Sequence, residues 1–507
     1  MKKSSILTAV FGVIIGVLLT LVVQLWARPS KIRVRDRDWQ KVNLILRSID
    51  ENYVDSVDHK KVTDIVAEAA LQALDPHSIY MVPKSLDAHE EDLAGNFDGI
   101  GIQFNVPNDT AIVLEVIPGG PSEKVGLKPG DRLLKVDTTC IAGVKFPQDS
   151  MVRRMKGKAG SKVNVLVKRD KETIPFEITR GKIPTHSVDA AFMVRDTVGY
   201  IRLSKFSRTT GQEFITAAAD LLDSGMKDLI VDLRDNTGGF LDQALILSNL
   251  FLPKDSVIVY IEGLHRKRED YKADGRGPLK EVGLSLLIDE NTASSSEIFA
   301  GAMQDNGRAM VVGRRSFGKG LVQEPFYFSD GSGMRITVAR FHTPSGRCIQ
   351  KPYTDDYNYE VLKRYNEGEM VVADSMKLEK GGIIPDVFVP MDATRAGKFY
   401  VACNRKATAM RFASAYFDDH KNELSAIDDF DELIRYLDGA GLESKFLDFA
   451  KRKDGIAPSS AEWAVDRKYV MTQLRALVGR YSKLGDNAYY HLFLDIDDCF
   501  NAALNKM

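Results

Sequence analysis

Hydrophobic and polar positions change their spacing several times along the chain. Between residues 32 and 93, apolar residues recur near the helical period, which predicts helices separated by turn-rich pieces. From about residue 96 to 182, apolar residues alternate with polar ones in short runs broken by glycine and proline. This pattern predicts a compact β-rich unit. Residues 396–507 are polar with many aromatic residues, and we expect them to be helical and to carry no chemical motif.

The stretch from residue 186 to 395 alternates between strand and helix patterns. Strands are predicted at 198–203, 228–233, 256–261, 284–288 and 309–313. Helices are predicted at 210–224, 239–251 and 295–305, and a β-rich end follows at 321–327, 334–341 and 386–389. Such alternation is typical of an α/β layer with largely parallel strands.

The patterns together predict a mixed α/β protein in five parts. A chain of 507 residues is long enough for about three domains. The parts are a membrane anchor or signal segment (1–30), an N-terminal helical region (31–95), an inserted β-rich domain (96–182), an α/β core (183–395) and a C-terminal helical extension (396–507).

The N-terminus carries an uncharged apolar run from Ile6 to Trp26, preceded by Lys2 and Lys3. About 20 apolar residues are enough to span a bilayer as a helix, and the flanking lysines favour the cytoplasmic side. We therefore expect an uncleaved membrane anchor. The alternative is a signal peptide cleaved near Ala27. Both place the body outside the cytoplasm, which is the periplasmic face of the inner membrane if the source is Gram-negative.

Composition narrows the function classes. Lysine and arginine number 69 and aspartate and glutamate 70, and this balance argues against a chain that binds nucleic acid. The four cysteines lie far apart, without zinc-ligand spacing, and no HExxH pattern occurs. We expect no metal, no other cofactor and no disulfide framework.

The segment around Ser294 is the strongest candidate for chemistry. An apolar strand ends in a short polar turn, and the small residues Ala293, Ser294 and Ser295 then open an apolar helix. The free N–H groups and positive dipole end of a helix N-terminus suit an oxyanion that forms during acyl transfer. The alternative is an ordinary helix cap, in which Glu297 completes a capping box.

Two further segments complement it. Lys319 lies between two glycines and is flanked by Phe317 and Leu321, so burial would lower its pKa and allow it to take a proton from a serine. Gln323, four positions later, is placed to orient the amine. The alternative is a surface turn. A third strand, 228–233, ends in a glycine pair, Gly238 and Gly239, whose N–H groups could bind an oxyanion.

Taken together, these three segments resemble the carboxyl-terminal processing peptidases, a family of tail-specific serine proteases. The matching stretches are 232–239, 291–298 and 317–323, supported by 74–78, 343–347 and 382–386. The resemblance implies that Ser294 is the nucleophile, Lys319 the general base and Gln323 the residue that orients it. It also implies oxyanion donors at the Ser295 N–H and at either Gly238 or Gly239. The family usually has alanine where Ser295 stands, so Ser296 stays a second candidate nucleophile.

The β-rich unit looks like a PDZ domain. The carrying residues are Gly99-Ile100-Gly101-Ile102 and the later segment 126–131. A glycine-rich loop before an edge strand can bind the terminal carboxylate of a peptide, which then adds as a strand. The resemblance implies that residues 99–102 bind substrate C-termini and that the domain gates the active site. Several relatives carry an arginine near Lys156, so this gating contact is expected to differ here.

The sequence therefore predicts a membrane-anchored serine endopeptidase that acts on proteins or peptides with free C-termini. One rival is a non-catalytic PDZ scaffold on an inactive peptidase fold. Another is a peptidase that stays silent until an activating partner or a second copy binds. A Ser–His–acid triad is a rival mechanism, for which His342 is better placed than His77 or His186.

Overall fold

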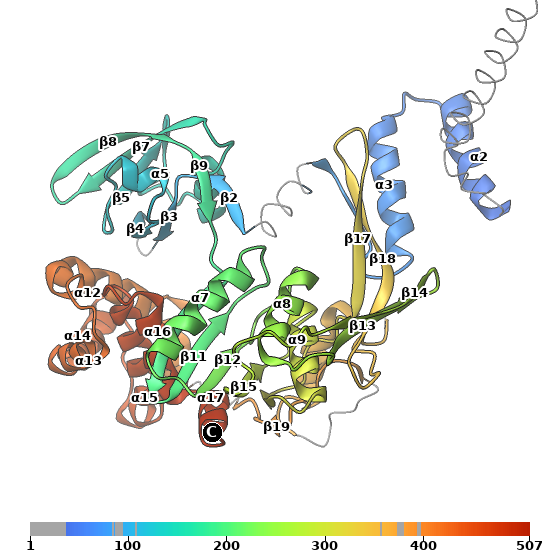
Figure 1. The fold of residues 1–507 in the computed structure, drawn as a ribbon. Helices are drawn as coiled ribbons and strands as arrows, with labels where there is room; N and C mark the ends of the chain where they lie inside the picture. The colour runs from blue at the N-terminus through green and yellow to red at the C-terminus, as the bar shows by residue number, and fades with distance from the viewer. Residues whose placement is uncertain are drawn as a thin grey trace, which may run out of the picture. The chain divides into compact units, whose positions relative to one another are not determined.

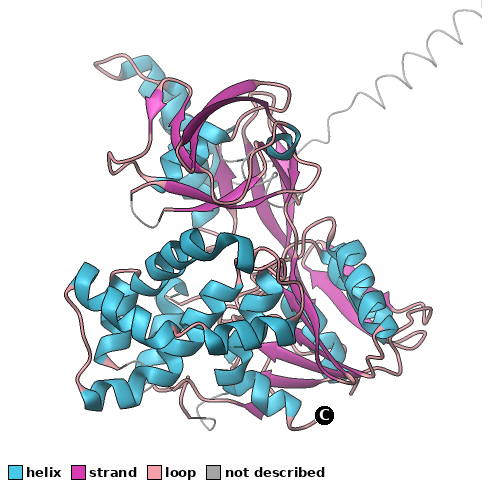
Figure 2. Ribbon diagram, turned by 90° about the vertical axis from the view of Figure 1, so that its left-hand side faces the viewer, coloured by secondary structure: helices cyan, strands magenta, loops and turns pink. Residues whose placement is uncertain are grey.

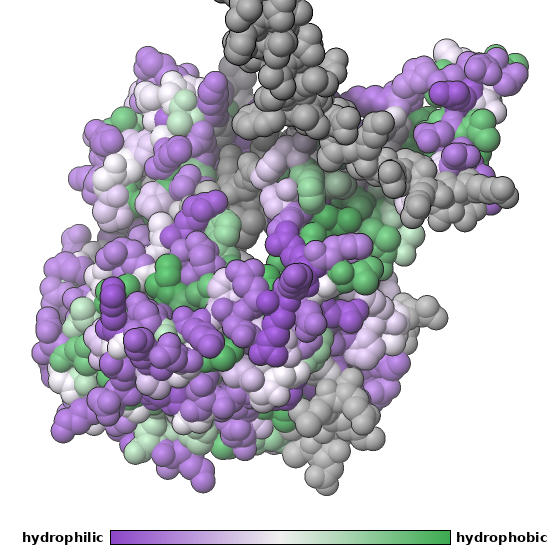
Figure 3. Space-filling model, turned by 45° about the vertical axis from the view of Figure 1, so that its right-hand side comes forward, coloured by the Kyte–Doolittle hydropathy of each residue, from purple (hydrophilic) through white to green (hydrophobic). Residues whose placement is uncertain are grey.

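The computed structural model describes residues 37–83, 86, 95–106, 109–354, 357–372, 380–392 and 397–507. The predicted anchor or signal segment, 1–30, lies outside the described residues. Among the helices that are described, none is long and apolar enough to cross a membrane. All four cysteines are free thiols. Most of the face seen in Figure 3 is hydrophilic, with hydrophobic side chains gathered in smaller areas.

The chain divides into two compact units, residues 1–69 and 70–507. The described part of the first contains α2 (Arg37–Asn52) and most of α3 (His59–Gln72), as the helical spacing of its apolar residues predicts. Residues 79–81 were expected within the helical region, and this prediction is wrong because they form β1 (Ile79–Met81). β1 pairs with a distant strand, so its conformation is set by a tertiary partner that local spacing does not reveal.

The β-rich unit is a curled antiparallel sheet with two short helices (Figure 1). Its strand order is β3-β4-β5-β7-β8, with β6 beside β5. The pair β2–β9 forms where the chain enters and leaves the unit. Val113, Leu133, Met151 and Val165 are at most 1% exposed in its core. The elements are β2 (Asn96–Gly99), β3 (Ile102–Asn105), β4 (Ala111–Val116), α5 (Pro121–Lys124), β5 (Arg132–Val136), β6 (Thr139–Cys140), α6 (Gln148–Met155), β7 (Lys162–Arg169), β8 (Glu172–Thr179) and β9 (Gly181–Pro184).

A six-stranded sheet in the order β10-β11-β12-β15-β16-β19 forms the centre of the core. Only β10 runs antiparallel to its neighbour, so the expected parallel layer is confirmed. The middle of β12 and most of β15 are apolar and buried, as strands covered on both faces must be. The strands are β10 (Val188–Arg195), β11 (Val198–Leu203), β12 (Asp228–Asp232), β15 (Gly283–Ile288), β16 (Met310–Gly313) and β19 (Val387–Phe388).

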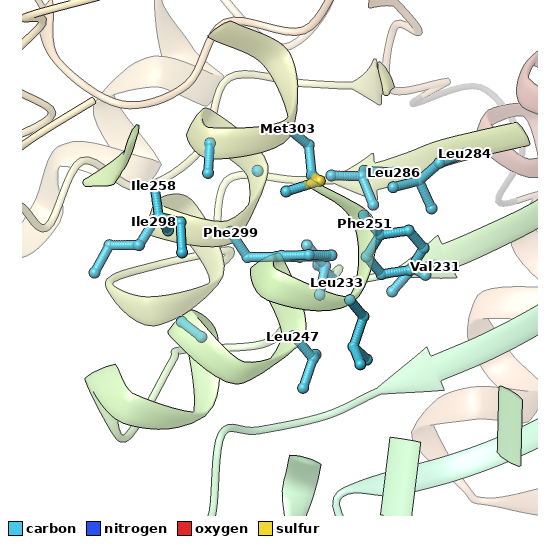
Figure 4. Packing of buried hydrophobic residues seen from close by; sticks show 14 of the residues in the cluster. Val231, Leu233, Leu247, Phe251, Ile258, Leu284, Leu286, Ile298, Phe299 and Met303 are labelled. Atoms are coloured by element: carbon cyan, nitrogen blue, oxygen red, sulfur yellow. The ribbon is translucent and has the colours of Figure 1, made fainter. Parts of the chain in front are cut away.

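Three helices cover one face of this sheet: α7 (Thr210–Asp223), α8 (Leu241–Phe251) and α9 (Ser295–Asp305). Figure 4 shows Phe251 of α8 and Phe299 of α9 packed against β12 and β15. The two rings lie 6.0 Å apart between centroids. Aromatic pairs bury large apolar areas, and this one fixes α9, whose first turn carries the serines.

The other face of the sheet is covered by the end of the chain. Here α16 (Asp486–Phe493), η5 (Leu494–Ile496) and α17 (Asp498–Leu504) pack on the strands. Phe500 is 3% exposed and meets the ring of Tyr200 at 5.9 Å. Residues 486–504 therefore complete the α/β core, although they belong to a stretch expected to form a separate helical extension.

The remaining C-terminal helices form a bundle with its own apolar core (Figure 2). Phe412, Phe446 and Leu474 lie at its centre. The bundle consists of α11 (Lys398–Arg405), α12 (Thr408–Leu424), α13 (Phe430–Gly439), α14 (Leu442–Phe449), η4 (Ala450–Asp454) and α15 (Ser460–Gly479).

A second sheet lies beside the core, in the order β1-β18-β13-β14 with β17 paired to β18. The prediction that 256–261 joins the parallel layer is wrong, because this segment is part of β13 and pairs antiparallel with β14 and β18. An isolated apolar run gives no signal of which sheet it enters. Besides β1, the strands of this sheet are β13 (Val257–Gly263), β14 (Arg266–Lys272), β17 (Leu321–Tyr327) and β18 (Gly333–His342). Two short helices follow β18 in the chain: η1 (Tyr357–Tyr359) and α10 (Glu360–Asn366).

Candidate active site

The site lies where two neighbouring parallel strands end. β12 and β15 run side by side with Asp232 paired to Leu287, so the loops that follow them meet. A Cβ added at Gly238 would lie 2.7 Å from the Ala293 carbonyl and 2.8 Å from the Ser295 nitrogen. This contact is too close for any side chain, and glycine is therefore required where the two loops touch.

Ser294 has an unusual backbone conformation, with φ 57° and ψ −118°. It is the residue that precedes α9, so the helix N-terminus begins directly after it. A positive φ at a residue with a Cβ costs free energy and is kept only where the surroundings fix it. Such strain concentrates at functional sites.

The two serines that follow make structural hydrogen bonds. Ser295 Oγ donates to the Gly239 carbonyl at 2.9 Å, which ties α9 to the glycine loop. Ser296 is fully buried, and its Oγ donates to the Asn236 carbonyl at 3.0 Å. Burial and this bond make Ser296 unsuited to attack a substrate, which favours Ser294 of the two candidates.

Glu297 joins the serine turn to the lysine loop. Its carboxylate is completely buried and accepts the N–H groups of Ser294 at 2.8 Å, Gly318 at 2.6 Å and Lys319 at 2.8 Å. The hydroxyl of Ser316 is a fourth donor. Burial raises the pKa of Glu297, and the four hydrogen bonds act against this shift. Capping the start of α9 is therefore only part of the role of Glu297.

Lys319 lies in the loop between β16 and β17 and is mostly enclosed. Burial lowers its pKa, and the positive charge of Arg335 lowers it further, while Glu297 and Asp75 act in the opposite direction. Desolvation disfavours an ammonium group, and a nearby cation adds to that effect. These surroundings favour the neutral amine that a general base requires.

Gln323 lies near the start of β17, the strand that follows the lysine loop. Its side-chain amide donates to the backbone carbonyl of His77 at 2.6 Å. This bond fixes the Nε2 end of the amide and leaves Oε1 as an acceptor. The segment 74–78 is thereby brought to the site.

The two glycines differ in what their N–H groups do. The N–H of Gly238 donates to Asn236 Oδ1 at 2.9 Å, so it is already used. Gly239 lies against the loop that follows β11, where an added Cβ would come 2.0 Å from the Phe206 carbonyl. Asn236 is buried and also donates to the Leu203 carbonyl at 2.8 Å, which holds this turn in place.

The three histidines have different positions. His186 is 63% exposed and 4.0 Å from Glu213, and the ring of His342 stacks on Tyr260 at 4.7 Å. Only His77 lies near the lysine, whose charge contributes to its lowered pKa. The position of His342 at a strand end favours it in the sequence, whereas in the structure the pairing of β1 with β18 brings His77 to the site.

Residues 99–102 lie at the edge of the β-rich sheet. The Ile100 carbonyl accepts from the N–H of Ser122 at 3.0 Å and from its Oγ at 2.6 Å, and the Gly101 carbonyl accepts from Ile117 N–H at 3.1 Å. The segment is thus held through its carbonyls. Ile102 begins β3, the edge strand. Lys156 ends α6 with its Nζ 4.5 Å from the centre of the Phe97 ring.

Comparison with known families divides the chain into three matched regions. The model of peptidase family S41 matches residues 197–359, and that of the PDZ domain matches residues 99–179. Residues 399–482 match a family of unknown function. The PDZ match covers the β-rich unit, and the S41 match includes Gly238, Ser294 and Lys319.

Individual relatives are similar over most of the chain. A probable CtpA-like serine protease of Staphylococcus saprophyticus is 30% identical over 358 residues, which is 70% of this chain and 72% of that protein. The carboxy-terminal processing protease CtpA of Bacillus subtilis is 32% identical over 318 residues, 62% of this chain and 67% of the relative. Among solved structures, the photosystem II D1 C-terminal processing protease is 27% identical with a TM-score of 0.39, covering 69% of this chain and 86% of that one.

Proposed function

Because this chain belongs to peptidase family S41 and is a serine-type peptidase with a PDZ domain, we propose that it cleaves peptide bonds with a Ser294–Lys319 dyad. In this mechanism neutral Lys319 takes the proton of Ser294 Oγ as the oxygen attacks the scissile carbonyl. Lys319 then gives that proton to the leaving amine, and the Ser294 ester remains. Water hydrolyses the ester in the second half, with Lys319 again as the base.

The observation that carries this proposal is the Glu297 bridge. One buried carboxylate binds the backbone N–H of both Ser294 and Lys319 at 2.8 Å. The loop with the nucleophile and the loop with the base are therefore fixed to the same group. Positioning of this kind lowers a barrier because the reacting groups need no further ordering.

The oxyanion of the tetrahedral intermediate would bind the N–H of Ser295 and that of Gly239. Ser295 N–H lies at the start of α9, where helix N–H groups have no partner within the helix. We choose Gly239 over Gly238 because the Gly238 N–H already donates to Asn236 Oδ1. Gln323 acts as a positioning residue, since its amide is fixed by the His77 carbonyl and its Oε1 can accept from the amine of Lys319.

The PDZ domain would select substrates by their C-termini. The carbonyls of Ile100 and Gly101 are used in holding the segment, which leaves its N–H groups for a terminal carboxylate. β3 is an edge strand, so an extended peptide can pair with it. Substrates of this class are proteins or peptides with a free, apolar C-terminus.

The N-terminal sequence indicates where the protein acts. The apolar run from Ile6 to Trp26, with Lys2 and Lys3 before it, supports a membrane anchor with the peptidase outside the cytoplasm. Such an enzyme would meet secreted and membrane-bound substrates. An activating partner or self-association would add control, and the C-terminal bundle offers a surface for either.

The proposal is tested by degradation of an unstructured protein with an apolar C-terminus, using the full chain in detergent. Wild type, Ser294→Ala and Lys319→Ala are compared, and a C-terminally amidated copy of the substrate runs in parallel. Cleavage by wild type alone, slowed by amidation, is the expected result. Cleavage by Ser294→Ala at the wild-type rate would refute the nucleophile. Tight binding of the tail without cleavage by wild type would favour the scaffold or a partner-activated enzyme.

A further inference from the structure

A chain of hydrogen bonds runs behind the lysine loop, from the residue after Lys319 to the residue that orients it. The N–H of Gly320 donates to Gln350 Oε1 at 3.0 Å. The other end of the same amide, Gln350 Nε2, donates to the hydroxyl of Tyr357 at 3.2 Å. Gln350 thus connects the backbone beside Lys319 to a tyrosine in η1.

The chain continues through His77 and closes. The hydroxyl of Tyr357 lies 2.5 Å from His77 Nε2. The carbonyl of His77 accepts from Gln323 Nε2 at 2.6 Å. Gly320 and Gln323 lie three positions apart on the chain. Gln350, Tyr357 and His77 connect them, so the hydrogen bonds form a closed ring at the base of the Lys319 loop.

The donors along this ring can be ordered around a neutral His77. Gln350 Nε2 can only donate, so the Tyr357 oxygen accepts there and its own proton is free to bond His77 Nε2. In that tautomer His77 accepts at Nε2 and carries its proton on Nδ1. Burial is the largest cause of the lowered pKa of His77, which falls to about 4; the charges of Lys319 and Lys351 lower it further, and Asp75 acts in the opposite direction. The Tyr357 hydroxyl contacts the same imidazole at Nε2.

We propose that Tyr357 is a positioning residue for Lys319: its hydroxyl closes the ring that holds Gly320 and Gln323 and bonds His77 Nε2. This inference rests on the proposed Ser294–Lys319 mechanism, which it deepens. Tyr357 does not reach the reacting atoms; it acts through Gln350 and His77. Loss of the hydroxyl would let Gln323 and the lysine loop move.

The ring of Tyr357 is held independently of its hydroxyl. The residue is 5% exposed, and its ring meets Phe317 at 6.5 Å and Tyr353 at 5.6 Å between centroids. Lys351 Nζ lies 4.2 Å from the ring centre. Tyr357→Phe keeps all of these contacts and removes one oxygen. Tyr353→Phe is the matched control, because Tyr353 is 42% exposed and its hydroxyl bonds to no other described residue.

The first measurement is steady-state cleavage by the full-length protein. We expect Tyr357→Phe to lower kcat roughly tenfold, the effect of losing about one buried hydrogen bond, with KM unchanged. Gln350→Met breaks the ring at another link and should lower kcat to a similar extent. The double variant should lose little more than either single one, because both open the same ring. Wild-type kcat in Tyr357→Phe, or an equal loss in Tyr353→Phe, overturns the inference.

The second measurement needs no activity. In protein with ¹³C-labelled histidine, the His77 resonance, assigned by its absence in His77→Gln, is followed against pH. In wild type it should titrate near pH 4, and in Tyr357→Phe it should move toward the ordinary histidine value of about 6.5. An unchanged His77 titration in Tyr357→Phe contradicts the donor order and the inference. A purely structural role for Tyr357 would not move this titration in a folded variant.

Lys319→Ala separates the two proposals. If Lys319→Ala is active, the dyad is wrong whatever Tyr357 does. If Lys319→Ala is inactive while Tyr357→Phe cleaves like wild type and leaves the His77 titration unchanged, the dyad stands and only the positioning role falls.

Discussion

Arg234 and Asp497 form an ion pair at 2.7 Å, and this pair links the loop beside the nucleophile to the C-terminal cap of the sheet. Arg234 also makes two bonds to the buried carboxylate of Asp232, at 2.9 and 2.6 Å. Asp497 in turn accepts the N–H of Phe500 at 3.0 Å and so caps α17. The turn that carries Gly238 and Gly239 therefore depends on a helix more than 250 positions later in the sequence.

Asp497→Ala should destabilise the protein by roughly 2 kcal/mol, since it removes a helix cap and one partner of a largely buried arginine. Urea unfolding measures the change. Asp495→Ala is the control, because that side chain is exposed on the preceding turn. Equal stability of the two variants would show that the ion pair and the cap contribute nothing.

Glu297→Gln should damage both stability and catalysis. Each carboxylate oxygen of Glu297 accepts from two donors, so an amide NH₂ in place of either oxygen faces two N–H or O–H groups. We expect a loss of roughly 2–4 kcal/mol in the free energy of unfolding, because unsatisfied buried donors are costly. Glu213→Gln is the matched control: this partly buried carboxylate on α7 accepts from Ser187 and Val188, outside the serine and lysine loops. Full activity in Glu297→Gln would contradict the bridge.

Arg335→Met should move the activity profile along the pH axis. Arg335 lowers the pKa of Lys319, so without it the amine holds its proton more strongly. The rising limb of kcat against pH, which lies below the ordinary lysine value of 10.5, should therefore move to higher pH. The variant should be weak near neutrality and recover in alkaline buffer. Arg340→Met removes the same charge from an exposed site on β18 and should leave the limb in place.

Gly239→Ala should abolish most activity. The added Cβ would meet the Phe206 carbonyl at 2.0 Å, so the turn must shift and its N–H leaves the oxyanion position. Loss of one oxyanion donor lowers kcat by about 10²–10³. Gly225→Ala is the control, since its φ is also positive at +93° but the nearest atom is 3.9 Å away. A similar kcat for the two variants would exclude Gly239 from catalysis.

Acid should destabilise the protein partly through His77. Its pKa is about 4 in the folded protein against 6.5 ordinarily, so between these values the unfolded chain binds the extra proton. By linkage, stability is fully present above pH 6.5 and is lost as the pH falls toward 4. Unfolding curves at several pH values should show a shallower dependence for His77→Gln in this window. A parallel dependence for wild type and variant would rule out the contribution.

The sequence predicted the elements that local patterns determine. The expected strand at 284–288 and helix at 295–305 agree with β15 and α9 to within one residue, because an apolar run and a helix start leave clear local marks. The motifs also singled out Ser294 and Lys319, which lie on loops that Glu297 joins, and Gln323, which lies on β17. Their roles stay predictions until the variants above are measured.

Long-range pairing is what the sequence did not reveal. Tyr357 and Gln350 lie in no motif, and they reach the lysine loop only because the chain returns beside it after β18. Residues 79–81 became a strand through pairing with 333–335. The covering of the sheet by α17 likewise depends on contacts between residues 300 positions apart, such as Tyr200 and Phe500. No local spacing encodes such contacts.

The covering of the central sheet by residues 486–504 has a consequence for the order of events in the cell. A chain emerges from the ribosome with its N-terminus first, and Ser294 and Lys319 are made long before α17. Until α17 arrives, Ile230 and Leu287 of the sheet lie open to water and Arg234 lacks Asp497. The central sheet of an unfinished chain is therefore uncovered on one face until residues 486–504 have been made.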